Sequence, residues 1–158
     1  MVRVKQVFGI IMVGLGLFYL EPVYSHYAGS SQNTQENTLF EKYSDEKLRQ
    51  AAIDGKAVII DFWADWCAAC KELEKKTFPA PEVQALRDQF VFLKYDATIT
   101  STDEFMELQE KYDILGLPHL VFYNPKGQHI KSLTLTGFEN ADRFAARMKK
   151  ALQAEEEL

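Results

Sequence analysis

Apolar residues in the body of the chain fall into short runs that are separated by polar, helix-favouring stretches. The clearest run is AVIIDFW, which Asp61 alone interrupts. A short continuous run of this kind predicts a central strand that is covered on both faces of its sheet. The pattern predicts strands at Ala57–Trp63, Phe90–Tyr95, His119–Tyr123 and His129–Leu135, the last two joined by a hairpin turn at Asn124–Gly127.

Capping and breaking residues predict the helices between these strands. Ser and Asn favour the position before a helix, and Gly and Pro favour its end. We expect a helix from Ser44 to a stop at Gly55, one from Cys67 to about Thr77, a short one around Glu82–Asp88, one opened by a capping box at Ser101–Glu104 and ending near Tyr112, and a last amphipathic one from Asn140 to about Leu152.

The order of these elements predicts the fold class. Strands alternate with helices, and a hairpin and a helix follow. This order is typical of an α/β fold with three layers, α/β/α, around a central mixed sheet. Hydrophobic residues make up 47% of the chain, enough for the core of one domain.

The N-terminus has a different pattern. Arg3 and Lys5 precede an uninterrupted apolar run, Val7–Leu20, which is short for a full membrane span of about 20 residues. Residues 1–25 are therefore interpreted as a signal peptide or an N-terminal membrane anchor, and both readings export the domain. We expect a polar linker over 26–38, the domain over 39–152 and an acidic tail over 153–158.

Charge and cysteine content narrow the function classes. The net charge is −5 without a basic cluster in the domain, which argues against a nucleic-acid partner. Apart from the two cysteines, the good zinc ligands are His26, His119 and His129, and His26 lies outside the domain. We expect neither a metal nor another cofactor.

Cys67 and Cys70 are the only cysteines, and they stand three residues apart at a predicted strand-to-helix junction. A thiolate is the attacking species in disulfide exchange, and the unpaired amides and dipole of a helix start stabilise it. We therefore expect Cys67 to attack a partner disulfide and Cys70 to resolve the mixed disulfide. A structural bridge is the weaker reading, because so small a loop restricts the unfolded chain little.

Two carboxylates are candidates for proton transfer. Asp61 lies inside the apolar strand, where desolvation raises the pKa of a carboxyl and fits it to accept a proton from a buried thiol. Glu74 follows Cys70 by four residues, at the edge of the same helical face. Its spacing is equally compatible with an ordinary surface glutamate.

The segment Asp61–Lys71 (DFWADWCAACK) resembles the active-site segment of thioredoxins, and Gly116-Leu117-Pro118 resembles their cis-proline loop. Over about residues 40–151 the chain is similar to the C-terminal thioredoxin-like domain of the DsbD family of thiol:disulfide interchange proteins. One departure from ordinary thioredoxins is Ala68-Ala69, which stands where they have Gly-Pro.

The resemblance implies a set of roles. Cys67 is the nucleophile, Cys70 the resolving thiol, and Asp61 and Glu74 handle protons. Pro118, in a bond that the resemblance favours as cis, docks substrate; Leu117 beside it and Trp66 are candidate contacts. Since the chain has no polytopic membrane segment, we expect a separate membrane or periplasmic thiol protein to donate electrons.

Three functions remain open at this stage. The first is an exported protein-disulfide reductase that acts on periplasmic proteins. The second uses the same chemistry in the other direction, as a thiol oxidase or isomerase. The third is a non-catalytic thioredoxin-like module that binds a partner at the membrane, against which the intact set of Cys67, Cys70, Asp61 and Pro118 counts.

Overall fold

The computed structural model describes residues 39–154, in which five strands form one mixed sheet in the order β1-β3-β2-β4-β5. The central strand β2 runs parallel to β3 and antiparallel to β4. The carboxyl ends of β2 and β3 and the amino end of β4 therefore meet at one end of the sheet. The strands are β1 (Phe40–Lys42), β2 (Ala57–Trp63), β3 (Phe90–Asp96), β4 (His119–Tyr123) and β5 (Leu135–Thr136).

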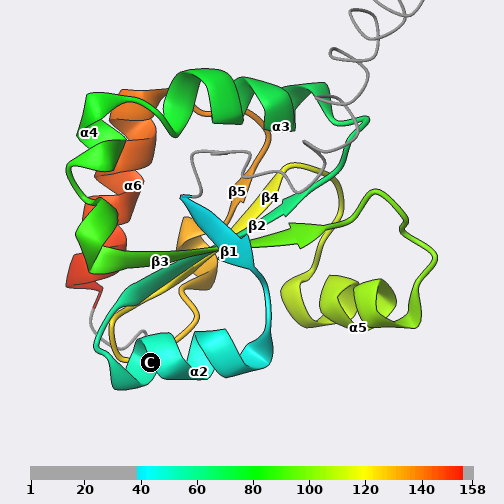
Figure 1. Cartoon of the computed structure of the whole chain (residues 1–158), viewed down its shortest axis with the longest axis horizontal. Coiled ribbons are helices and arrows are strands. Elements are labelled where there is room, and N and C mark those ends of the chain that lie inside the picture. The colour runs from blue at the N-terminus through cyan, green and yellow to red at the C-terminus, as the bar shows by residue number, and fades with distance from the viewer. Residues whose placement is uncertain (1–38, 155–158) are drawn as a thin grey trace, which may run out of the picture. The chain divides into compact units, whose positions relative to one another are not determined.

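Helices cover both faces of the sheet. In Figure 1, α3, α4 and α6 lie on one face, and α2 and α5 lie on the other. The predicted three-layer α/β/α fold is confirmed. The α-helices are α2 (Asp45–Ile53), α3 (Ala68–Glu72), α4 (Pro81–Gln84), α5 (Asp103–Tyr112) and α6 (Ala141–Gln153), with a π-helical turn η1 (Leu73–Thr77) and 3-10 turns η2 (Arg87–Gln89) and η3 (Lys131–Leu133).

Alternation along β2 builds two hydrophobic cores, one on each face. Ile59 packs with Leu73, Phe122 and Phe144 beneath α3 and α6. Phe62 packs on the other face with the side chains of α2 and α5. Asp61 lies two residues from Ile59, so its side chain belongs to the face that carries α3.

The helix after Cys67 begins as predicted but changes its winding. It is α-helical to Glu72 and continues as one π turn, in which the Phe78 N–H donates to the Leu73 carbonyl over 2.9 Å. Leu73 and Thr77 both face the core, and the Thr77 hydroxyl donates to the Glu139 carbonyl over 2.6 Å. These two side chains, four residues apart, therefore share one inward face.

The predicted strand at His129–Leu135 is wrong. His129 makes a single bridge to Tyr123, η3 follows, and only Leu135–Thr136 pair with β4. Ile130 and Leu135 are both buried. Five residues separate them, and a strand would place them on opposite faces, so the 3-10 turn is what allows both to enter the core.

Two smaller predictions need correction. The cap of α5 is Thr102, whose hydroxyl accepts from the Phe105 N–H, one residue later than the Ser101 expected from a capping box. Strand β1 was not predicted, because a three-residue edge strand is too short to show a period. Ser44 and Asn140 cap α2 and α6 as expected.

The predicted signal or anchor, the linker and most of the acidic tail lie outside the described residues. Within residues 39–154, no helix is both long and apolar enough to cross a membrane. The predicted division of the chain at residues 1–25, 26–38 and 153–158 stays a prediction.

Two glycines with positive φ offer a matched test of packing at the other end of the sheet. A Cβ at Gly127 would lie 2.7 Å from the Ala52 Cβ, whereas nothing lies within 4 Å of one at Gly55. We expect Gly55→Ala to lower the free energy of unfolding by about 1 kcal/mol, through backbone strain alone. Gly127→Ala should lose roughly 2–4 kcal/mol, since overpacking adds to the strain.

Urea unfolding of both variants, followed by circular dichroism, measures the difference. Equal decreases in the free energy of unfolding of the two variants would show that α2 moves away from the turn without a free-energy cost.

Candidate functional site

Cys67 and Cys70 form a disulfide at the start of α3, at the carboxyl end of β2. Cys67 is the N-cap residue, and its sulfur accepts a hydrogen bond from the Cys70 N–H over 3.2 Å. Cys67 is 5% exposed and Cys70 2%. The predicted positions at a helix start are confirmed, and the Cys70 amide that donates to the Cys67 sulfur is placed to stabilise a thiolate there in the reduced state.

The residue before the pair is exposed and is held by a neighbouring loop. The indole ring of Trp66 is 62% exposed, and its N–H donates to the Thr98 carbonyl over 3.2 Å. The Asp65 N–H donates to the Thr98 hydroxyl over 3.1 Å. A large apolar side chain fixed in solvent beside a reactive sulfur suits contact with another protein.

The loop before β4 closes the other side of the disulfide. The Leu117–Pro118 peptide bond is cis, in agreement with the resemblance to thioredoxins. Leu117 packs against the small apolar cluster of Ala64, Cys67 and Cys70. The Pro118 carbonyl accepts a hydrogen bond from the Gly137 N–H over 3.1 Å, which ties this loop to the end of β5.

Asp61 is 2% exposed and lies on the sheet face beneath α3. Among the described residues, its Oδ1 atom has no hydrogen-bond partner. Burial raises its pKa to about 7, Lys94 opposes the rise and Glu74 adds to it. A carboxyl with this pKa exchanges protons near neutral pH, which is what the sequence predicted for it.

Lys94 is the residue of this site that sequence reasoning missed. It pairs with Asp61 in the register of β2 and β3, and its ammonium group forms an ion pair with Glu74. The same group lies 4.1 Å from the centroid of the Trp63 ring. The alternation Phe90, Phe92, Lys94 was the available signal, since it puts a cation on the inner face of a strand.

The structure therefore brings together Cys67, Cys70, Leu117 and Pro118, with Asp61 in the layer below. Glu74 is half-buried and reaches Lys94, so its effect on Asp61 is electrostatic. Direct proton exchange between Glu74 and Cys70 stays a prediction. In residues 39–154, no three His, Cys, Asp or Glu side chains gather in a way that could hold a metal ion.

Comparison with known proteins decides the family. The profile of a thioredoxin-like family matches residues 40–125. This stretch is more than half of the 158 residues and includes the disulfide, Asp61 and Pro118. The chain belongs to the thioredoxin-like family.

Its curated relatives within this family include thiol:disulfide interchange proteins DsbD. This chain is 35% identical over 150 residues to DsbD from Cronobacter sakazakii and 41% identical over 108 residues to DsbD from Pseudoalteromonas atlantica. These alignments cover 91% and 68% of the chain but 26% and 18% of the relatives. The chain thus spans about a quarter or less of their length.

A solved structure agrees with the likeness in sequence. The oxidised C-terminal domain of DsbD from Neisseria meningitidis superposes with a TM-score of 0.56 at 29% identity. The match covers 70% of this chain and 97% of that domain. The resemblance to this domain that the sequence indicated is confirmed.

The buried state of Asp61 predicts a pH-dependent stability. Its pKa is about 7 in the folded protein against 3.8 as an ordinary value, so the folded state holds the extra proton. Stability is therefore lost as pH rises from about 4 to about 7, and the penalty is complete above that. We expect Asp61→Asn to be more stable than wild type at pH 8, by about 2–4 kcal/mol, and nearly equal at pH 4.

Urea unfolding of the oxidised proteins at both pH values measures this difference. The exposed substitution Asp54→Asn on the α2 cap is the control and should show no such trend. A constant difference between Asp61→Asn and wild type across the pH range would mean that Asp61 titrates normally.

Proposed function

We propose that this chain is a thiol:disulfide oxidoreductase that reduces disulfides in other proteins. The observation that carries the proposal is the arrangement at the end of β2, where a lone cysteine pair caps a helix above a buried carboxyl with a pKa near 7. The names of the curated relatives support the same activity.

The reaction proceeds by two exchanges. The Cys67 thiolate attacks one sulfur of the partner disulfide, which forms a mixed disulfide and releases the other partner sulfur as a thiolate. Cys70 then loses its proton and attacks the Cys67 sulfur. The Cys67–Cys70 disulfide forms, the second partner thiolate leaves, and two electrons have passed to the partner.

Asp61 supports the second exchange. Its carboxylate lies under the helix that carries Cys70 and takes up the proton that this buried thiol must lose. At neutral pH the carboxyl is about half protonated, since its pKa is about 7, so it can accept this proton and return it in the next cycle.

Reduction of the resulting disulfide needs an external dithiol that supplies two electrons. We assign this role to a separate membrane or periplasmic thiol protein, docked on Trp66, which is exposed, and on the partly exposed Leu117, which precedes the buried Pro118. We also propose that the domain is exported to the periplasm, either released there or tethered through residues 7–20. Support for export comes from Arg3, Lys5 and the apolar run after them.

The division of labour between the cysteines predicts a trapping result. In Cys70→Ser, partner proteins should accumulate on Cys67 as mixed disulfides, because the resolving thiol is absent. Non-reducing electrophoresis of protein taken from the native compartment, after rapid acid quenching, detects them as bands that dithiothreitol removes. The matched variant Cys67→Ser should trap far less, and equal trapping by both variants would contradict the assigned order of attack.

The direction of electron flow is tested by the equilibrium potential of the Cys67/Cys70 pair in glutathione or dithiothreitol buffers. A reductase requires a potential close to that of thioredoxin, about −270 mV. A value near −120 mV would instead identify an oxidant. Failure of Cys67→Ser to affect function in the native compartment would favour a non-catalytic binding module.

A further inference from the structure

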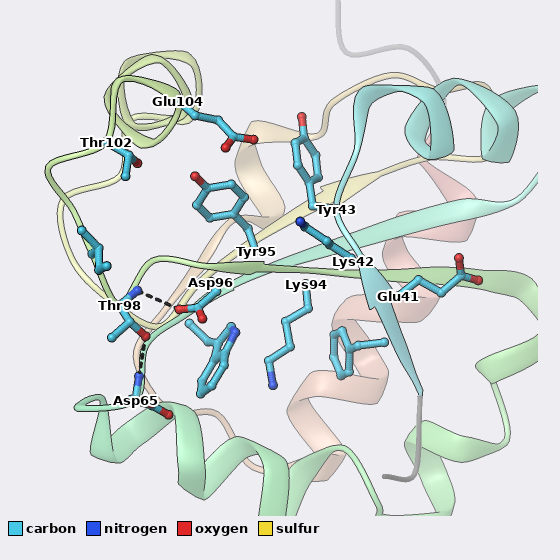
Figure 2. A pocket seen from close by; sticks show the side chains of 13 residues that line it. Glu41, Lys42, Tyr43, Asp65, Lys94, Tyr95, Asp96, Thr98, Thr102 and Glu104 are labelled. Atoms are coloured by element: carbon cyan, nitrogen blue, oxygen red, sulfur yellow. Dashed lines mark hydrogen bonds between the residues drawn. The ribbon is translucent and has the colours of Figure 1, made fainter. Parts of the chain in front are cut away.

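A pocket of about 700 Å³ opens at the edge of the sheet where β1 ends (Figure 2). Strand β1 pairs only with Phe92–Lys94 of β3, and the chain then leaves for α2 after Tyr43. Tyr95 and Asp96 continue β3 beyond this point and line the pocket. The pocket is therefore a gap in the edge of the sheet that the short first strand leaves uncovered.

This pocket adjoins the redox centre. Asp65, two residues before Cys67, lines it together with Thr98. The Asp65 N–H and the Trp66 indole both donate to Thr98, so one short loop connects the exposed tryptophan to the pocket wall. A polypeptide joined to Cys67 in a mixed disulfide thus has the pocket within reach of its neighbouring residues.

The walls of the pocket are aromatic and suited to a cation. The rings of Phe40, Tyr43, Trp63 and Tyr95 line it. Two of them already face a positive charge, since the Lys94 ammonium lies 4.1 Å from the Trp63 ring centroid and 5.8 Å from that of Phe40, which leaves Tyr43 and Tyr95. Aromatic faces bind Lys and Arg heads, and their flanking surfaces cover the aliphatic stems.

Acidic side chains outnumber basic ones around the pocket. Its carboxylates are Glu41, Asp65, Asp96 and Glu104, against Lys42 and Lys94. Lys94 is paired with Glu74, and Glu41 with Lys47, both outside the pocket lining.

The remaining carboxylates lie outside these ion pairs. No ion pair within residues 39–154 involves Asp65, Asp96 or Glu104. Hydrogen bonds from Thr98 lower the pKa of Asp96, which stays ionised at neutral pH. Figure 2 shows the Glu104 carboxylate on α5 directed toward Tyr95, above the pocket.

We propose that this pocket binds a Lys or Arg side chain that lies close in sequence to the reacting cysteine of the partner protein. The inference rests on the proposed function, because it assigns a substrate preference to the same redox centre. Three carboxylates that form no ion pair within residues 39–154 and the aromatic lining carry it. The charges of Lys42 and Lys94 oppose it, and Glu74 offsets that of Lys94. The pocket thereby selects partners whose disulfides stand in basic segments.

The first test measures reduction rates. The reduced full-length protein is mixed with three disulfide peptides that are identical except for Arg, Gln or Glu at the positions flanking the cysteine. At low ionic strength we expect the Arg peptide to react about fivefold faster than the Gln peptide, the size of a partly exposed ion pair. Salt should reduce this preference. Equal rates, or a faster Glu peptide, would overturn the proposal.

Variants of the pocket carboxylates test whether the preference for the Arg peptide arises in the pocket. Glu104→Gln combined with Asp96→Asn should bring the Arg-to-Gln rate ratio below about twofold, while Asn keeps the hydrogen bond to Thr98. Glu107→Gln combined with Glu110→Gln is the matched control, because it also removes two charges, from exposed positions of α5 that do not line the pocket. Reduction of 2-hydroxyethyl disulfide, which is small and neutral, should be unchanged in all variants. An Arg-to-Gln rate ratio that stays fivefold in the double variant would show that the preference for Arg does not arise in this pocket.

A second test does not depend on redox chemistry. Cysteine-free versions of the three peptides are titrated against the oxidised protein, and fluorescence of Trp63, with Trp66 replaced by Phe, reports binding in the pocket. Tighter binding of the Arg peptide to wild type, and its loss in the double variant, would support the cation site in the pocket. If such binding is seen but no disulfide is reduced, the proposed function fails and the cation site stands. If the protein reduces 2-hydroxyethyl disulfide but prefers the Arg peptide in neither test, the cation site in the pocket is rejected and the proposed function stands.

Discussion

The burial of one carboxyl group in the central strand is the constraint on which the site depends. Asp61 is buried and occupies a position that alternation assigns to the same core-facing side of β2 as Ile59. An ionised group there loses its hydration, which is costly unless the charge is neutralised or used. In the proposed mechanism, the fold accepts this cost beside the buried thiol that has to give up a proton.

Neighbouring groups reduce the free-energy cost of ionising the buried Asp61 carboxyl but do not remove it. Lys94 faces Asp61 across the β2–β3 pair and favours its charged form, yet Glu74 and the Trp63 ring both hold the lysine ammonium. A full ion pair would have kept the Asp61 carboxylate permanently charged and useless for proton uptake. Because the Lys94 ammonium is shared among Asp61, Glu74 and the Trp63 ring, it does not cancel the effect of burial. The pKa of Asp61 stays at about 7, so both protonation states are populated near neutral pH.

Sequence patterns predicted the parts of this arrangement that depend on local order. A continuous apolar run identified β2 with Asp61 inside it, and the spacing of the cysteines identified the helix start. The central strand, the caps at Ser44 and Asn140 and the layer order followed from period and capping. Contacts between distant segments did not follow, because neither the partner of Lys94 nor the loop formed by Asp65 and Thr98 has a local signal. The strand expected at His129–Leu135 failed for a related reason, since burial of Ile130 and Leu135 in one core overrode the local preference.

The π turn at Leu73–Thr77 holds one residue more than regular α-helical winding would hold. The Phe78 N–H donates to the Leu73 carbonyl across this turn, so the extra residue is taken up locally and the helix on either side keeps its facing. Removal of Lys75 or Lys76 would turn this hydrogen bond into an ordinary α-helical one. Glu74 would stay beside Lys94, and Thr77 would stay on the side of the Glu139 carbonyl. When other members of the family are aligned to this chain, a gap of one residue at this turn would therefore leave the electrostatic environment of the buried carboxyl intact, provided that the glutamate is kept.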